Sequence, residues 1–177
     1  MYRNNLMSDR RHKYSDQPYV HFVTFTCDLR RKLFQEDQPK RILLGQLNTQ
    51  LTRVSAKCVG FVIMPDHVHA LLWCEETNQL SSLMQHWKRL SSHAIRTWYR
   101  IQRPKYFQVA QEMKRVWTPK YYDYPIDTES KVNEKLEYMH LNPVRTGLVS
   151  NITDWKWSSA RWYVFRKSVG IPIDWVN

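Results

Sequence analysis

The chain has 177 residues, of which 42% are hydrophobic and 14% aromatic, and its 27 Lys and Arg outnumber 16 Asp and Glu to give a formal net charge of +11. This length and apolar content are typical of a folded protein with a sizeable core and exclude a largely disordered chain. The positive charge favours a polyanionic partner, nucleic acid first, and the glycines form neither GxGxxG nor GxxxxGK[ST], so a nucleotide cofactor has no support.

We expect a single domain over residues 1–177, with a basic N-terminal arm and an aromatic C-terminal tail. The N-terminus lacks the apolar core of a signal peptide and no apolar run is long enough to span a membrane. A cytoplasmic, nucleoid-associated protein without a membrane partner is therefore predicted. Cys27, Cys58 and Cys74 are odd in number and form no CxxC pair, which indicates buried thiols rather than disulfides or a zinc site.

The first half of the chain alternates strand and helix signals. Residues 18–28 are rich in β-branched and aromatic side chains and predict a strand. Residues 41–55 carry leucines at helical spacing and predict an amphipathic helix. Two further strands, over residues 57–64 and 67–74, are joined by a Pro-Asp dipeptide, which predicts an antiparallel pair with a short connection.

Residues 80–103 predict a long helix with one apolar and one basic side. Apolar side chains recur at steps of three and four; they are Leu83, Trp87, Leu90, Ala94, Trp98 and Ile101. Four arginines fall on roughly the opposite side: Arg89, Arg96, Arg100 and Arg103. Residues 77–111 contain six Lys or Arg and no acidic residue. This basic side is either a nucleic-acid contact or an ordinary solvated helix face.

The rest of the chain predicts shorter elements. Pro104 marks the end of the long helix. Residues 116–127 then predict a strand with a Pro-containing entry. Residues 131–142 predict a helix that must stop there, because Pro143 disfavours helical geometry at the residue before it. The tail carries four tryptophans, and we expect it to form short elements that pack back on the body; they are Trp155, Trp157, Trp162 and Trp175.

The strand segment MPDHVHALLW carries two histidines one residue apart. His67 and His69 share one face of a strand, roughly 7 Å apart at the backbone, and could chelate a divalent ion. They could equally be two hydrogen-bonded, half-buried strand residues. The chain is too short for a metal-dependent hydrolase barrel and too poor in glycine for a double-stranded β-helix.

The predicted helix near residue 140 offers partners for the histidine pair. Tyr138 and Asn142 are four residues apart and share a helix face, whereas His140 lies about 200° around the helix from Tyr138 and points elsewhere. A packed tyrosine and a helix-ending asparagine are the ordinary alternative for these two residues. Taken separately, neither motif decides between a site and a core.

Four motifs occur in order along the chain: MPDHVHALLW, VWTPKYYDYPI, YMHLNPVRTGLV and DWKWSSARWY. The ordered set resembles the REP-associated tyrosine transposases, relatives of the single-tyrosine transposases of the HUH nuclease class. The resemblance implies an α+β, ferredoxin-like fold with a central antiparallel sheet and packed helices. It implies that Tyr138 is the catalytic nucleophile and that the metal ligands are His67, His69 and Asn142. Asp66 stands where relatives often carry Asn.

The resemblance also implies an activity: metal-dependent cleavage and rejoining of single-stranded DNA at REP-type hairpins through a 5′-phosphotyrosine intermediate. Mg²⁺ is the expected ion, with Mn²⁺ as a substitute, and the chain is expected to act as a monomer or homodimer. Eight basic residues are predicted to contact DNA: Arg10, Arg11, Lys13, Lys88, Arg89, Arg96, Arg100 and Arg103. Two alternatives remain, a hairpin-binding protein without catalysis and an unrelated metal hydrolase that acts on a small molecule.

Overall fold

The structure is a computed structural model that describes residues 20–76, 78–109 and 114–175. Its sheet has four antiparallel strands in the order β2-β3-β1-β4. The strands are β1 (Val20–Thr26), β2 (Lys57–Ile63), β3 (His67–Trp73) and β4 (Tyr122–Ile126). The helices are η1 (Asp28–Arg30), α1 (Asp37–Arg53), α2 (Gln79–Gln102), α3 (Pro104–Val109), α4 (Glu129–Arg145) and α5 (Ala160–Phe165).

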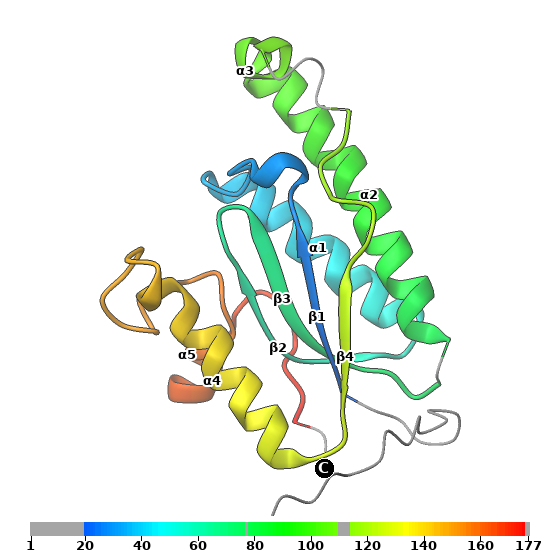
Figure 1. Ribbon diagram of the computed structural model, residues 1–177, viewed down its shortest axis with the longest axis vertical. Coiled ribbons are helices and arrows are strands. Elements are labelled where there is room, and N and C mark those ends of the chain that lie inside the picture. Colours follow the sequence, from blue (N-terminus) through cyan, green and yellow to red (C-terminus); the bar gives the residue numbers. More distant parts are fainter. Residues whose placement is uncertain (1–19, 77, 110–113, 176–177) are drawn as a thin grey trace, which may run out of the picture.

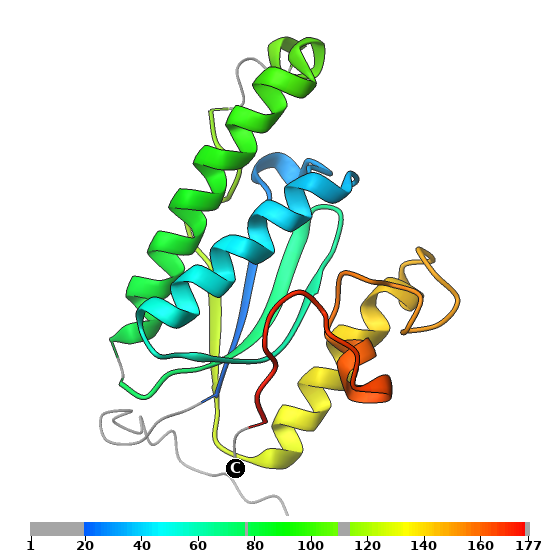
Figure 2. The ribbon, with the colours of Figure 1, turned by 180° about the vertical axis from the view of Figure 1, so that it is seen from behind.

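The helices cover both faces of the sheet, with α1 and α2 on one side and α4 on the other (Figures 1 and 2). Apart from the short α3, the order β1-α1-β2-β3-α2-β4 and the strand arrangement are those of a ferredoxin-like fold. The predicted α+β, ferredoxin-like class is therefore confirmed. The predicted antiparallel pair β2–β3 is confirmed as well, and β3 is an inner strand with a neighbour on each side.

Helix α2 forms as predicted, but its buried stripe differs from the predicted one. Ile101 is exposed, whereas Ser91, one turn after the buried Trp87, is fully buried. A small hydroxyl fits here because it accepts a hydrogen bond from the indole nitrogen of Trp117 at 3.1 Å. The prediction followed apolar residues only and so passed over Ser91. The buried residues of α2 are Leu80, Leu83, Met84, Trp87, Ser91, Ile95 and Tyr99.

The strand predicted within residues 116–127 is shorter than that range, because only Tyr122–Ile126 pairs as a strand beyond one isolated bridge at Trp117. Pro119 has no N–H to donate to a ladder. The ammonium of Lys88 on α2 also binds the carbonyl oxygens of residues 118, 119 and 120 at 2.9 to 3.1 Å. These carbonyls are therefore committed to a side chain rather than to a neighbouring strand.

Helix α4 ends later than predicted, at Arg145 instead of residue 142. Pro143 lies inside its last turn, where the missing N–H removes a single intrahelical hydrogen bond. The turn is closed by other donors: Thr146 donates from its backbone and its hydroxyl to the Asn142 carbonyl, and Leu148 donates to the Pro143 carbonyl. The proline therefore marks the end of the helix without stopping it at once.

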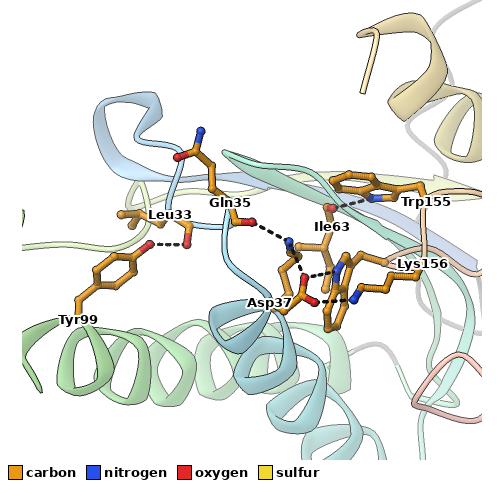
Figure 3. A network of polar contacts seen from close by, with 9 residues as sticks. Leu33, Gln35, Asp37, Ile63, Tyr99, Trp155 and Lys156 are labelled. Carbon is orange, nitrogen blue, oxygen red and sulfur yellow. Dashed lines mark hydrogen bonds and ion pairs between the residues drawn. The ribbon is translucent and has the colours of Figure 1, made fainter. Parts of the chain in front are cut away.

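The aromatic tail packs back on the sheet and on α1, as predicted. Figure 3 shows Trp155 donating to the carbonyl of Ile63, at 3.0 Å, and Lys156 paired with Asp37 at the start of α1. The Trp157 indole donates to the same carboxylate at 2.9 Å. The hydrogen bond from Lys156, with smaller contributions from Lys40 and Trp157, lowers the pKa of Asp37 to about 2. The tail therefore fixes the beginning of α1 with charge and hydrogen bonds as well as apolar contact.

The predicted buried thiols are confirmed, since all three cysteines are buried and free. No helix in the described ranges combines the length and apolar character that crossing a membrane requires.

Gly60 on β2 determines how closely α4 approaches the sheet. A Cβ at this position would lie 2.5 Å from Leu136 Cδ2, 3.1 Å from Ser159 Oγ and 3.3 Å from Met139 Cε. Leu136 and Met139 are buried residues of α4. Because Gly60 has no side chain, α4, the helix that carries Tyr138, can pack this close to β2.

We expect Gly60→Ala to lower the free energy of unfolding by about 1–3 kcal/mol, because the added methyl overpacks the contact with α4. Urea unfolding followed by circular dichroism measures the change. Gly45→Ala is the matched control, since a Cβ there meets nothing within 4 Å. Equal effects of the two substitutions would contradict this account of the packing.

His140 lies away from the tyrosine face of α4, as predicted, and its Nε2 is 2.8 Å from the Ser159 hydroxyl. Burial lowers the pKa of His140 to about 4. An unfolded imidazole titrates near 6.5, so the unfolded chain binds more protons between these values and stability falls as the pH falls from about 6.5 towards about 4. Burial lowers the pKa of His69 as well.

We expect His140→Gln to reduce this acid sensitivity. The substitution removes a loss of about 2 kcal/mol in the free energy of unfolding between about pH 7.5 and about pH 4.5. Urea unfolding of both proteins at the two pH values measures it. An unchanged pH dependence in the variant would show that His140 does not carry the effect.

Candidate active site

The two histidines of β3 face α4, as strand alternation predicts. Leu71, which shares their face, belongs to the core under α4, whereas Val68 and Ala70 belong to the core under α1 and α2. The imidazole ring centroids of His67 and His69 are 4.9 Å apart.

Each imidazole has its own hydrogen-bond partner at Nδ1. His67 Nδ1 is 2.6 Å from Asp66 Oδ1, and His69 Nδ1 is 2.7 Å from the Thr24 hydroxyl. A carboxylate only accepts, so Nδ1 of His67 carries a proton, which leaves Nε2 as the ring nitrogen that can bind a metal. Asp66 also lies 3.6 Å from the Arg30 guanidinium. The Asp66 carboxylate therefore fixes the orientation of the His67 ring.

His69 has a buried nitrogen atom, Nε2, whose lone pair a bound cation would satisfy. This Nε2 has no hydrogen-bond partner among the described residues, a costly state for a polar atom inside a protein. Burial, with a smaller contribution from His67, lowers the pKa of His69 to about 3, so the ring is neutral at physiological pH and can donate its lone pair. Ligand histidines in proteins are commonly oriented by such a hydrogen bond at the other nitrogen. The pair fits a divalent metal.

Tyr138 extends from α4 towards the histidine pair. Its ring centroid is 5.4 Å from that of His69 and 6.2 Å from that of Phe22, both in edge-to-face geometry. The Arg145 guanidinium lies 5.8 Å from the same ring. The side chain of Tyr138 is 41% exposed, so its hydroxyl is open to a ligand while its ring is held by neighbours.

A hollow of about 500 Å³ lies beside Tyr138 and His69. Its walls are mostly aromatic, with one cation: the lining is Phe22, Thr24, His69, Tyr122, Tyr124, Lys135 and Tyr138. The Lys135 ammonium lies 5.8 Å from the Phe22 ring and 5.9 Å from the Tyr124 ring. Exposed aromatic faces beside a cation are suited to stacking unpaired bases next to a phosphate.

Asn142 lies one helical turn beyond Tyr138 on α4 and is half-buried. In the described part of the chain, no hydrogen bond joins its side chain to either imidazole. Nor do three or more His, Cys, Asp or Glu side chains gather for metal binding in those residues. A metal site here therefore depends on the histidine pair with an oxygen donor of another kind, and Asn142 stays a prediction.

The predicted DNA-contacting residues differ in their surroundings. Arg89 and Arg100 are exposed on α2. Arg103 forms a bidentate ion pair with Glu36, with both distances 2.7 Å. Arg96 is half-buried, and its buried Nε has no partner in the part of the chain that the structure describes.

The three N–H donors of the Lys88 ammonium all form hydrogen bonds with backbone carbonyls. Arg10, Arg11 and Lys13 lie outside the described residues. The DNA-contact assignment of all eight basic residues stays a prediction.

Sequence reasoning missed several residues of the site. Thr24 and Phe22 enter it because β1 pairs antiparallel with β3, which places Thr24 opposite His69. That register cannot be obtained from either strand alone. Lys135 carried a usable signal, because it precedes Tyr138 by three residues and therefore shares its helix face.

The ferredoxin-like sheet carries the histidine pair on an inner strand, with Tyr138 on the helix above it. The chain belongs to the IS200-like transposase family, whose model matches residues 14–142. That range contains both histidines, Tyr138 and Asn142.

Two relatives are REP-associated transposases. The REP-associated tyrosine transposase of Escherichia coli (strain K12) is 24% identical over 121 residues, which cover 67% of this chain and 61% of the relative. The match thus spans less than two thirds of that relative's length. A Haemophilus influenzae protein, provisionally assigned the same name, is 25% identical over 153 residues, which cover 79% of this chain and 82% of that protein.

Solved structures share the fold. The REP-associated tyrosine transposase bound to a REP hairpin superposes with a TM-score of 0.68 at 21% identity, covering 97% of this chain and 92% of that chain. A provisionally assigned transposase of Deinococcus radiodurans superposes with a TM-score of 0.51 at 17% identity, covering 78% of this chain and 95% of that chain. At these identities the likeness establishes the fold.

Proposed function

We propose that the protein cleaves and rejoins single-stranded DNA at folded REP-type hairpins, with Tyr138 as the nucleophile. The observation that supports this most is the cluster of His67, His69 and Tyr138, which brings an accessible phenol beside two imidazoles. The family to which the chain belongs supports a DNA-cleaving reaction. The hairpin is suggested by the relative that was solved with one.

The chemistry follows from the residue types. The phenolic oxygen of Tyr138 attacks the phosphorus of a phosphodiester, and the bond from phosphorus to the 3′ oxygen breaks. One strand leaves with a 3′ hydroxyl, which takes up the proton that the phenol gives up, and the other stays joined to Tyr138 through its 5′ phosphate. A 3′ hydroxyl can then attack the phosphotyrosine and release Tyr138. Each step replaces one phosphate ester bond with another, so rejoining needs no ATP.

The surrounding residues bind and orient the strand in this proposal. Tyr122 and Tyr124 offer exposed faces for unpaired bases, and Lys135 offers a cation for a flanking phosphate. Mg²⁺, with Mn²⁺ as a substitute, would be held by His67, His69 and Asn142 and would supply positive charge that polarises the scissile phosphate.

A covalent-adduct assay tests the proposal. The protein is incubated with end-labelled single-stranded hairpin DNA from its own genomic neighbourhood, with Mg²⁺, Mn²⁺ or EDTA, and the products are separated on a denaturing gel. We expect a slowly migrating protein–DNA adduct with either metal and none with EDTA. Tight binding without an adduct in any condition would instead assign the protein to hairpin binding without catalysis, and neither binding nor an adduct would contradict both functions.

A further inference from the structure

A second hollow, of about 590 Å³, lies on the other side of the sheet from Tyr138. It opens between α2 and residues 114–121, the segment that leads into β4 and runs beside α2 in Figure 1. Its floor includes the buried Met84 and Trp117. Its volume falls within the range of small-molecule binding sites.

The lining of this hollow is basic. It contains Lys88, Arg89, Lys114 and Arg115, and none of the described residues that line it is acidic. Burial lowers the pKa of Lys88 to about 8, so this ammonium is still charged at neutral pH, but its donors hold the carbonyls of residues 118–120. Lys88 therefore shapes the wall, while the exposed Arg89 and Arg115 are open to an anion.

Strand β4 connects the two hollows. It is an edge strand of the sheet. The side chain of Tyr121, just before the strand, and that of Tyr122, its first residue, face opposite sides of the sheet. Tyr121 lines the basic hollow and packs against the core under α2, whereas Tyr122 lines the hollow beside Tyr138. A chain that leaves the Tyr138 hollow over Tyr122 therefore reaches the basic hollow by crossing one strand.

We propose that the basic hollow binds one nucleotide of the single strand that flanks the cleaved phosphodiester. The inference rests on the proposed function and adds a second subsite to it. The base lies against Tyr121, where Ser81, Gln85 and Ser92 offer polar groups to its edge. The two phosphates on either side of the nucleotide lie on Arg89 and Arg115.

Salt dependence of binding provides the first test. The probe is fluorescein-labelled oligothymidylate of about 20 nucleotides, which has no hairpin, and the variant is Arg89→Ala with Arg115→Ala. We expect about tenfold weaker binding at low salt and a log–log salt slope smaller in magnitude by about 1.4, because each single-strand phosphate contact contributes roughly 0.7. Lys105→Ala with Lys167→Ala, two exposed lysines outside the lining, removes the same charge and should leave the slope unchanged.

Photo-crosslinking locates the strand and separates this proposal from the proposed function. Tyr138→Phe protein is irradiated with a hairpin substrate that carries single 5-iodouracils along its flanking strand, and the crosslinked peptides are identified by mass spectrometry. A crosslink to residues 114–121 from one flanking position is the expected result. Crosslinks confined to Tyr122, Tyr124 or α4 would overturn the second subsite while leaving the proposed function intact. Absence of any binding to the substrate would contradict both.

Discussion

Replacing Tyr138 with Phe is expected to abolish the covalent protein–DNA adduct, with a loss of at least about 1,000-fold in the rate of its formation. The substitution removes only the phenolic oxygen, and no bond to phosphorus can form without it. The ring contacts with His69 and Phe22 are kept, so binding of hairpin DNA should change by less than about threefold. The rate is measured by quenching the reaction in denaturant at successive times, and binding by fluorescence anisotropy.

Tyr124→Phe is the matched control for this substitution, because Tyr124 lines the same hollow and also keeps its ring. It should retain adduct formation. A Tyr138→Phe protein that still forms the adduct at the wild-type rate would contradict the assignment of the nucleophile, and the tyrosines that line the hollow would then be the next candidates.

The second large effect is expected at His69. The unpartnered, buried Nε2 of this residue predicts that Mn²⁺ stabilises the folded protein, by about 2.7 kcal/mol at a metal concentration about 100 times the dissociation constant. His69→Leu should remove this stabilisation and the metal-dependent adduct together. Thermal unfolding of the protein with Mn²⁺ and with EDTA measures the first effect without requiring DNA or activity.

His93→Leu provides the comparison, since His93 is an exposed histidine on α2, away from the candidate site. The melting temperature of the His93→Leu protein should rise with Mn²⁺ as that of the wild type does. An equal rise in the His69→Leu protein would show that the metal binds elsewhere, and the histidine pair would then be two ordinary strand residues.

Much of the fold could be predicted because its signals are local. The Pro-Asp turn between two apolar segments predicts the β2–β3 pair, and strand alternation predicts that His67 and His69 share a face. The order of the motifs predicts the ferredoxin-like topology by resemblance. Within the site, the four-residue spacing predicts that Tyr138 and Asn142 share one face of α4.

Other features depend on contacts between distant segments and could not be predicted. The hydrogen bond between Thr24 and His69 requires the register of β1 against β3. Ser91 is buried in α2 because Trp117 reaches it. Residues 118–120 do not extend β4 because Lys88 binds their carbonyl oxygens. In each case a polar group finds a partner that sequence periodicity does not reveal.

Identification of the covalent linkage tests the central claim most directly. The adduct formed by the wild-type protein is digested with trypsin and nuclease, and the modified peptide is sequenced by mass spectrometry, while the released strand is offered to a DNA polymerase. We predict a nucleotide joined through its 5′ phosphate to Tyr138 and a released strand that the polymerase extends from its 3′ hydroxyl. Attachment to a different residue, or a released strand that ends in a 3′ phosphate, would contradict the proposed mechanism.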